Sequence, residues 1–280
     1  AAALAGLLHA LKGHADALED DIKALQFMET TLNNVGSATH YSAVCDIWRF
    51  LAAGTGNASM VVSNFAQKAI FTQLEDEQQQ QHSSNELCDQ VLLLGDTPKE
   101  CWPSILSKLA TSHYVRGTFS DGGIAGFYVF SLIEKMCLEV CLKPLSTQVI
   151  TLLDDVLSTA RLFIIRVKAL NLVERLMKAS EDGGNEEAAL RLAALWQAVA
   201  TRALRDPEPQ VRAAALRTLG AFPFRVLRPE DTAEIYANAV SKSGGDSDKA
   251  VREEALRLFT KMSSFVPSLI GPYTSADFGA

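Results

Sequence analysis

Hydrophobic positions recur with a helical period along almost the whole chain. Leu18, Ile22, Leu25, Met28 and Leu32 are three or four residues apart, which places them on one face of an α-helix. No run of alternating apolar and polar residues indicates a β-strand. The pattern therefore predicts an all-α protein with short loops between its helices. The expected helices span residues 2–12, 16–33, 41–53, 59–75, 86–94, 98–112, 124–142, 147–157, 159–179, 186–205, 208–221, 230–243 and 248–264.

Several of these helices begin with residues that can cap them. The run from Thr97 to Glu100 (TPKE) reads as a capping box with proline at the first helical position. Asn185 precedes two glutamates, which places an acceptor and two negative charges at a helix N-terminus. Asp231 and Asp246 are expected to cap the last two helices in the same way.

Four stretches interrupt the helical pattern. Residues 75–85 (EDEQQQQHSSN) are polar and charged without apolar positions, which is typical of a loop or a frayed helix. Residues 120–123 (SDGG) predict a second loop, and residues 54–57 and 180–184 predict shorter turns.

Two segments near the C-terminal end repeat one another. Residues 206–220 (DPEPQVRAAALRTLG) and residues 246–260 (DSDKAVREEALRLFT) match at intervals of 40 residues. A weaker copy begins at Ile165-Arg166, 46 residues before Val211-Arg212, and it has Ala160 in place of the aspartate. A period of 40–47 residues built from two helices is typical of an α-solenoid. The matched positions are Asp206 and Asp246, Val211 and Val251, Arg212 and Arg252, Ala215 and Ala255, Leu216 and Leu256, and Leu219 and Phe259.

At these residues the sequence resembles the HEAT-repeat family. The pattern D-x-x-x-x-V-R-x-x-A-x-x-x-L of the second helix of such a repeat is present from Asp206 to Leu219. The resemblance implies a right-handed α-solenoid of HEAT-type helical pairs, with about six repeats. It divides the chain into degenerate helical repeats over 1–149, recognisable HEAT repeats over 150–264 and an irregular tail over 265–280.

The resemblance also implies a structural role for the charged positions of the repeat. In HEAT repeats the arginine typically reaches the aspartate of a neighbouring repeat, and the pairs form a ladder along the stack. The ladder residues expected here are Asp206, Arg212, Asp246, Arg252 and Arg166. The alternative interpretation is that these arginines and aspartates contact a ligand.

Composition and charge narrow the classes of partner. The chain has 280 residues, of which 48% are hydrophobic and 21% charged, and a formal net charge of −7. All of the excess negative charge is in residues 1–150, which carry 9 basic and 16 acidic residues, whereas residues 151–280 carry 17 of each. This balance argues against nucleic-acid binding through bulk charge, because phosphate contacts need a basic face.

The sequence holds no recognisable chemical site. Its five histidines are scattered, and its five cysteines lack the spacing of a zinc site or a disulfide framework. The longest apolar stretch, residues 124–133, is too short to cross a bilayer. We therefore expect no catalytic residues, no cofactor, no metal and no membrane contact. The cysteine usage favours a reducing compartment, either the cytoplasm or the nucleus.

The leading functional hypothesis is a non-catalytic scaffold or assembly factor that binds other proteins over an extended surface. Residues 227–240 (LRPEDTAEIYANAV), followed by the second repeat segment, look broadly similar to the end of a HEAT-repeat axonemal dynein assembly factor. One alternative is a nuclear transport receptor segment, whose acidic surface would bind basic cargo. The alternative from another functional class, the enzymes, is a HEAT-like DNA glycosylase. The arginines after residue 160 are compatible with DNA binding, whereas the net negative charge of the chain argues against it.

Overall fold

The computed structural model of the chain describes residues 91–92, 94–96, 99–140, 147–224 and 227–265. Within these ranges every regular element is a helix, and no strand occurs among them. The all-α prediction is therefore confirmed for the described residues. They divide into two compact units. The first takes the described residues up to Val115 together with Tyr128–Met136, and the second takes Arg116–Phe127 and the described residues from Cys137 onward.

The first unit is built around Trp102. It contains the short 3-10 helices η3 (Leu94–Asp96) and η4 (Lys99–Cys101), helix α6 (Trp102–Thr111) and the central part of α8 (Ile124–Val140). The indole ring of Trp102 is buried, and the ammonium groups of Lys99 and Lys135 lie 5.8 and 5.3 Å from its centroid. These distances allow cation–π attraction on top of apolar burial.

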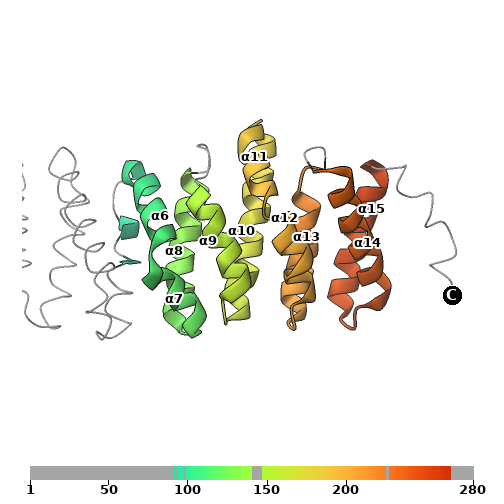
Figure 1. The fold of residues 1–280 in the computed structure, drawn as a ribbon, viewed down its shortest axis with the longest axis horizontal. Coiled ribbons are helices and arrows are strands. Elements are labelled where there is room, and N and C mark those ends of the chain that lie inside the picture. The colour runs from blue at the N-terminus through green and yellow to red at the C-terminus, as the bar shows by residue number, and fades with distance from the viewer. Residues whose placement is uncertain (1–90, 93, 97–98, 141–146, 225–226, 266–280) are drawn as a thin grey trace, which may run out of the picture. The chain divides into compact units, whose positions relative to one another are not determined.

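The second unit contains the longer run of helices (Figure 1). It includes most of α7 (His113–Asp121) and both ends of α8. The remaining elements are α9 (Thr147–Thr159), α10 (Phe163–Asp182), α11 (Glu186–Ala193), α12 (Trp196–Thr201), η5 (Ala203–Arg205), α13 (Pro209–Ala221), α14 (Pro229–Gly245) and α15 (Lys249–Phe265).

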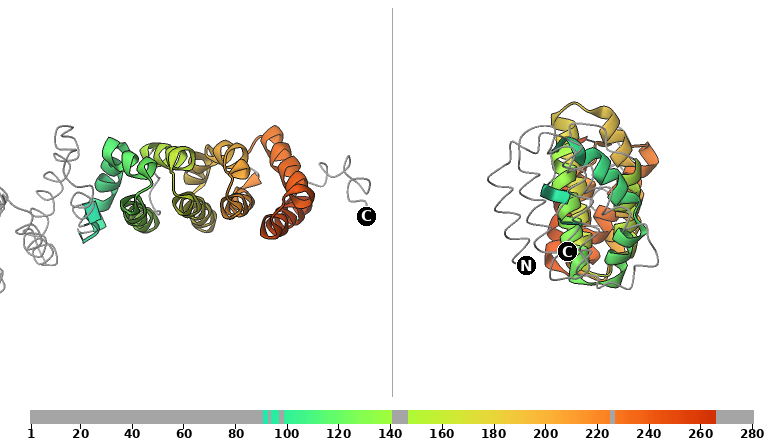
Figure 2. Two further views of the ribbon diagram at one scale, coloured as in Figure 1. Left: turned by 90° about the horizontal axis from the view of Figure 1, so that it is seen from below. Right: turned by 90° about the vertical axis from the view of Figure 1, so that its left-hand side faces the viewer.

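Helices of the second unit form two layers (Figure 2). In one layer α10, α13 and α15 pack side by side, so that α13 has a helical neighbour on each side. In the other layer α9 packs against α11 and α12. Helix α12 and η5 lie against α13, and α14 lies against α15, which gives two successive helical pairs.

The middle position of α13 explains its composition. Ala213, Ala214 and Ala215 are all buried, and small side chains let α10 and α15 approach the helix closely. The buried hydroxyl of Thr218 donates to the carbonyl oxygens of Leu170 on α10 (3.0 Å) and Ala214 (2.9 Å). The polar atom is thus satisfied inside an apolar contact, as buried polar groups require.

Most of the expected helices from residue 98 onward are present, with shifts of a few residues at their ends. The largest difference is at 186–205, where one expected helix is three elements: α11, α12 and η5. No glycine or proline marks these breaks in the sequence. The chain bends between α11 and α12 where Leu192, Leu195 and Val199 are all buried, so packing against the neighbouring layer decides the break.

Helix α7 was not expected at all, although its buried residues Val115, Thr118 and Phe119 lie at helical spacing in the run HYVRGTFSD. The expected loop at 120–123 is reduced to a turn between α7 and α8, in which Gly122 has a φ of +72°. The expected helices before residue 86, the stripe within 16–33 and the loops at 54–57 and 75–85 lie outside the described residues.

Candidate functional site

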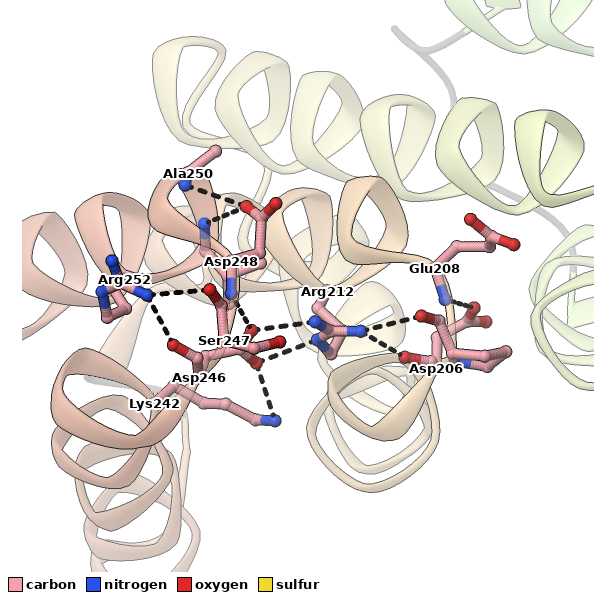
Figure 3. Close-up of polar contacts among 11 residues, drawn as sticks. Asp206, Glu208, Arg212, Lys242, Asp246, Ser247, Asp248, Ala250 and Arg252 are labelled. Carbon is pink, nitrogen blue, oxygen red and sulfur yellow. Dashed lines mark hydrogen bonds and ion pairs between the residues drawn. The ribbon is translucent and has the colours of Figure 1, made fainter.

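The charged residues of the repeat meet in pairs between successive helical pairs (Figure 3). Arg212 on α13 donates from Nε and Nη2 to the two carboxylate oxygens of Asp246, at 2.9 and 2.8 Å. Its third nitrogen, Nη1, donates to the backbone carbonyls of Asp206 (2.9 Å) and Pro207 (3.0 Å). The guanidinium thus joins the turn before α13 to the turn before α15.

The Arg212–Asp246 pair is well shielded from water, with side-chain exposures of 12% and 3%. The hydrogen bonds from Arg212 hold the pKa of the Asp246 carboxyl well below its usual range, although burial opposes this shift. The same pairing raises the pKa of Arg212. A two-point, charge-assisted contact of this kind fixes both the distance and the orientation of the two helices.

The same geometry occurs one repeat earlier. Arg166 on α10 donates from Nε and Nη2 to the carboxylate of Asp206, at 2.7 and 2.9 Å. Its Nη1 donates to the carbonyl of Ala160 at 2.6 Å. Arg166 and Arg212 therefore each make a complete rung, defined here as an arginine bonded both to the turn preceding its helix and to the next aspartate.

Each rung aspartate also organises its own turn. One oxygen of Asp206 accepts from the backbone N–H of Glu208 (3.0 Å), and one of Asp246 accepts from that of Asp248 (3.1 Å). Asp246 additionally accepts from the ammonium of Lys242 at 3.1 Å. With most of their lone pairs engaged, these carboxylates are suited to holding structure rather than to proton transfer.

Upstream of Arg166 the repeat departs from the pattern, because Ala160 has no carboxylate to offer. Arg116 on α7 lies instead against Asp155 on α9, with Nη1 and Oδ2 2.8 Å apart. Both side chains are 35% exposed as a whole, against 13% or less in the rungs. Sequence reasoning missed it because Asp155 lies outside the repeat register.

Arg252 completes only half of a rung. Its Nη1 donates to the carbonyls of Asp246 (2.7 Å) and Ser247 (3.0 Å), as in the other two arginines. Within the part of the chain that the structure describes, no carboxylate pairs with it. The structure therefore brings Arg166 together with Asp206 and Arg212 with Asp246, and among the described residues it gives Arg252 backbone carbonyls alone.

A separate surface feature lies between α9 and the α11–α12 region. It is an open groove of about 470 Å³. One end carries Asp154 and Arg202, whose carboxylate and guanidinium are 3.2 Å apart and about half exposed. The lining residues are Ile150, Thr151, Asp154, Ala194, Leu195, Gln197, Ala198, Thr201 and Arg202. Sequence patterns did not indicate this groove, since it depends on the bend between α11 and α12.

The expected helix caps are only partly correct. Asn185 does cap α11, accepting from the N–H of Ala188 at 3.1 Å. Asp231 lies inside α14 and pairs with Arg228 instead, which lowers the pKa of its carboxyl. At α15 the cap is Asp248, which directly precedes the first helical residue Lys249 and whose carboxylate accepts from the N–H groups of Ala250 and Val251.

The α-helix expected to begin at Pro98 begins at Trp102, so the capping box at 97–100 does not open it. Thr97 and Pro98 lie outside the described residues, and Lys99–Cys101 form the 3-10 turn η4. Among the described residues, no three His, Cys, Asp or Glu side chains gather as a metal site would require. None of the described helices is both long enough and apolar enough to span a bilayer.

The fold and the rungs together define an all-helical repeat protein. The family model for the HEAT repeat matches residues 198–222, a span that begins in α12 and runs through η5 and α13. The match therefore falls on one helical pair and supports the HEAT-repeat resemblance over that part of the chain. No curated protein matches the chain significantly.

Proposed function

We propose that the chain is a non-catalytic scaffold that binds other proteins through a right-handed HEAT-type stack of about six repeats. The observation that carries the proposal is the match of the HEAT repeat to residues 198–222, together with rungs of the same geometry on both sides of α13. HEAT repeats generally mediate contacts between proteins, because stacked helical pairs expose a long continuous surface.

The proposed division of labour follows the sequence. Residues 150–264 form the regular part of the stack, residues 1–149 degenerate repeats and residues 265–280 a tail. The rungs at Arg166 and Arg212 hold successive pairs in register, which keeps the binding surface rigid before a partner arrives. A preorganised surface loses less conformational entropy on binding than a mobile one.

The groove between α9 and α12 is the proposed contact region for a segment of the partner. Its lining mixes apolar, hydroxyl and amide groups with one acidic and one basic side chain, a composition typical of protein interfaces rather than of small-molecule sites. The test is capture of partners from native extract with the full chain as bait, read by mass spectrometry.

A matched pair of variants makes the capture specific. Thr151→Glu adds a charge inside the groove, and Thr260→Glu adds the same charge on exposed α15. Both threonines donate their hydroxyl to the carbonyl four residues earlier, so the changes have similar local costs. Loss of a stoichiometric partner with Thr151→Glu alone would support the groove, whereas equal capture by both variants would contradict it.

The finer proposal is that the chain is a cytoplasmic assembly factor for dynein arms, which rests on the resemblance of residues 227–240 and the repeat that follows. Dynein chains captured together with chaperones would support it. The acidic balance of residues 1–150 favours a second candidate, a nuclear transport receptor segment, and Ran captured with basic cargo would support that one.

A further inference from the structure

Within the second unit, the first turns of α8 and α10 lie side by side. The backbone N–H of Arg161, two residues before α10, donates to the carbonyl of Phe119 at 3.0 Å. A Cβ atom at Gly122, in the turn before α8, would lie 2.9 Å from Cδ of Arg161, so the aliphatic stem of this arginine lies directly over the glycine. The ammonium of Lys168 on α10 is 5.2 Å from the ring centroid of Phe127 on α8. These contacts hold the two helix starts together.

Large apolar side chains are exposed on these two first turns. Ile124, the first residue of α8, is 66% exposed, and Phe163 and Ile164, the first two residues of α10, are 39% and 44% exposed. They make up half of the six large apolar side chains that are exposed among the described residues. Exposed apolar side chains that gather in one place are typical of a contact surface. These three residues are called the apolar patch below.

Positive charge borders the apolar patch. Arg161 is exposed, and no carboxylate within the described ranges forms an ion pair with it, although Asp121 lies in the adjoining turn. The stem of Arg161 is fixed over Gly122, so its guanidinium is available two residues before Phe163. The N-terminal ends of α8 and α10 add the positive ends of two helix dipoles. The patch is therefore complementary in charge to a carboxylate.

We propose that the apolar patch and Arg161 bind a short segment of another protein that carries an acidic residue beside one or two large apolar residues. The carboxylate of the segment accepts from the guanidinium of Arg161, and its apolar side chains cover Ile124 and Ile164. The contact then has an apolar centre and a charged group at its rim, as protein interfaces commonly do. A membrane surface fits less well, because attraction to anionic lipids depends on clusters of cations.

This surface is separate from the groove between α9 and α12. The two charges at the end of the groove, Asp154 and Arg202, already pair with each other, whereas the cation beside the apolar patch has no such partner. The two surfaces therefore select different segments, and either proposal can fail without the other.

Selection of displayed peptides tests the chemistry of the partner. A library of short random peptides is selected on the full chain and, in parallel, on the variants Ile124→Ser and Ile164→Ser. The unmodified chain is expected to enrich peptides with aspartate or glutamate beside large apolar residues, and the two variants are not. Both substitutions are at helix starts, where serine is well tolerated, and thermal unfolding of each variant verifies that the fold is kept.

One enriched peptide, once synthesised, makes the test quantitative by fluorescence anisotropy. Its dissociation constant is expected to rise about tenfold in Ile124→Ser and about threefold in Arg161→Gln, which changes a contact at the rim. Replacing the carboxylate of the peptide by an amide should remove the effect of Arg161→Gln, because the two changes break the same contact. Leu190→Ser, which changes a leucine of α11 that is 52% exposed, is the matched control and should leave the constant unchanged.

Three outcomes would overturn the proposal. The first is that the unmodified chain enriches no peptide that Ile124→Ser loses. The second is that the enriched peptides lack an acidic residue or bind equally well to Arg161→Gln. The third is that Ile124→Ser and Arg161→Gln weaken binding to phosphatidylserine vesicles while no peptide binds, which would assign the patch to a membrane surface. A peptide that is lost in Thr151→Glu but retained in Ile124→Ser lies in the groove, and such a result also counts against the patch.

Discussion

Helices α13 and α15 have the same sequence pattern and different surroundings. Val211 and Val251 are both fully buried. At the next matched apolar position the two helices differ, since Leu216 is fully buried and Leu256 is 47% exposed. The pattern therefore specifies a helix with two apolar faces, and the number of helical neighbours decides how many of those faces are buried.

The largest expected difference between the two helices comes from truncating these leucines. Leu216→Ala removes a side chain that is enclosed in the middle of the unit and should destabilise the fold by about 2–5 kcal/mol. Leu256→Ala should cost less than about 1 kcal/mol, because much of that side chain already contacts water. Equilibrium denaturant unfolding of the two variants measures both values.

Equal losses of unfolding free energy in Leu216→Ala and Leu256→Ala would contradict the comparison. They would mean that Leu256 is as well covered in solution as Leu216. Val251→Ala is the control for α15, since Val251 is fully buried and should be costly to truncate in either case.

The second expected difference concerns the arginines. Arg212→Gln leaves the carboxylate of Asp246, which is 3% exposed, without its two-point partner, and should cost about 2–4 kcal/mol. The carboxylate keeps its contact with Lys242, which limits the loss. Arg252→Gln breaks contacts only to backbone carbonyls among the described residues and should cost less.

Thermal unfolding of both variants checks this order. If Arg212→Gln does not lower the melting temperature, the ladder interpretation of the repeat is wrong. Arg212→Gln can destabilise the fold by breaking the ion pair and by leaving a buried carboxylate unpaired. The double variant Arg212→Leu with Asp246→Asn helps to separate these two causes, because it breaks the pair without leaving a buried charge.

The third expected difference is in acid stability. The pKa of Asp246 is held below its unfolded value of about 3.9, so the contact stabilises the fold fully above that pH. Stability is then lost as the pH falls below about 4 toward the folded pKa, because the unfolded chain binds the proton first. The loss should be smaller than that from Arg212→Gln, since a protonated Asp246 leaves Arg212 bound to its two carbonyls.

Unfolding free energies measured between pH 6 and pH 2 test this sign. Asp246→Asn should be less stable near neutral pH and should show a shallower acid loss than the unmodified chain. Asp182→Asn, which removes an exposed carboxylate at the end of α10, is the matched control for the loss of one negative charge.

Sequence patterns predicted the regular part of this molecule well. Helices α13 and α15 follow from a repeat in which the same residue types recur 40 apart. The pairing of an arginine with the aspartate of a neighbouring repeat was implied by the resemblance to HEAT repeats, and Arg212 contacts Asp246 in this way. The helix cap formed by Asn185 at the start of α11 was predicted equally well, because an amide followed by two glutamates is a local signal that needs no tertiary contact.

The features that were missed depend on neighbours far away in the sequence. Residues 186–205 contain only good helix-forming signals, and the breaks around α12 arise from packing against α9 and α13. Asp248 caps α15, whereas the carboxylate of Asp246 binds a distant arginine. A local pattern identifies candidate groups, and the competition between partners decides which of them pair.

The smallest expected effect comes from the pair of Arg116 and Asp155, which is found upstream of Arg166 in place of a rung. Arg116→Gln breaks the contact with Asp155, but both side chains are about a third exposed, and such pairs contribute less than about 1 kcal/mol. Arg166→Gln, one position along the stack, should cost several times more, because its partner Asp206 is nearly buried. Chemical unfolding of the two variants in low and high salt distinguishes them further, since screening weakens the exposed pair more strongly. A cost for Arg116→Gln as large as that for Arg166→Gln would show that Asp155 serves as a full rung despite standing outside the repeat register.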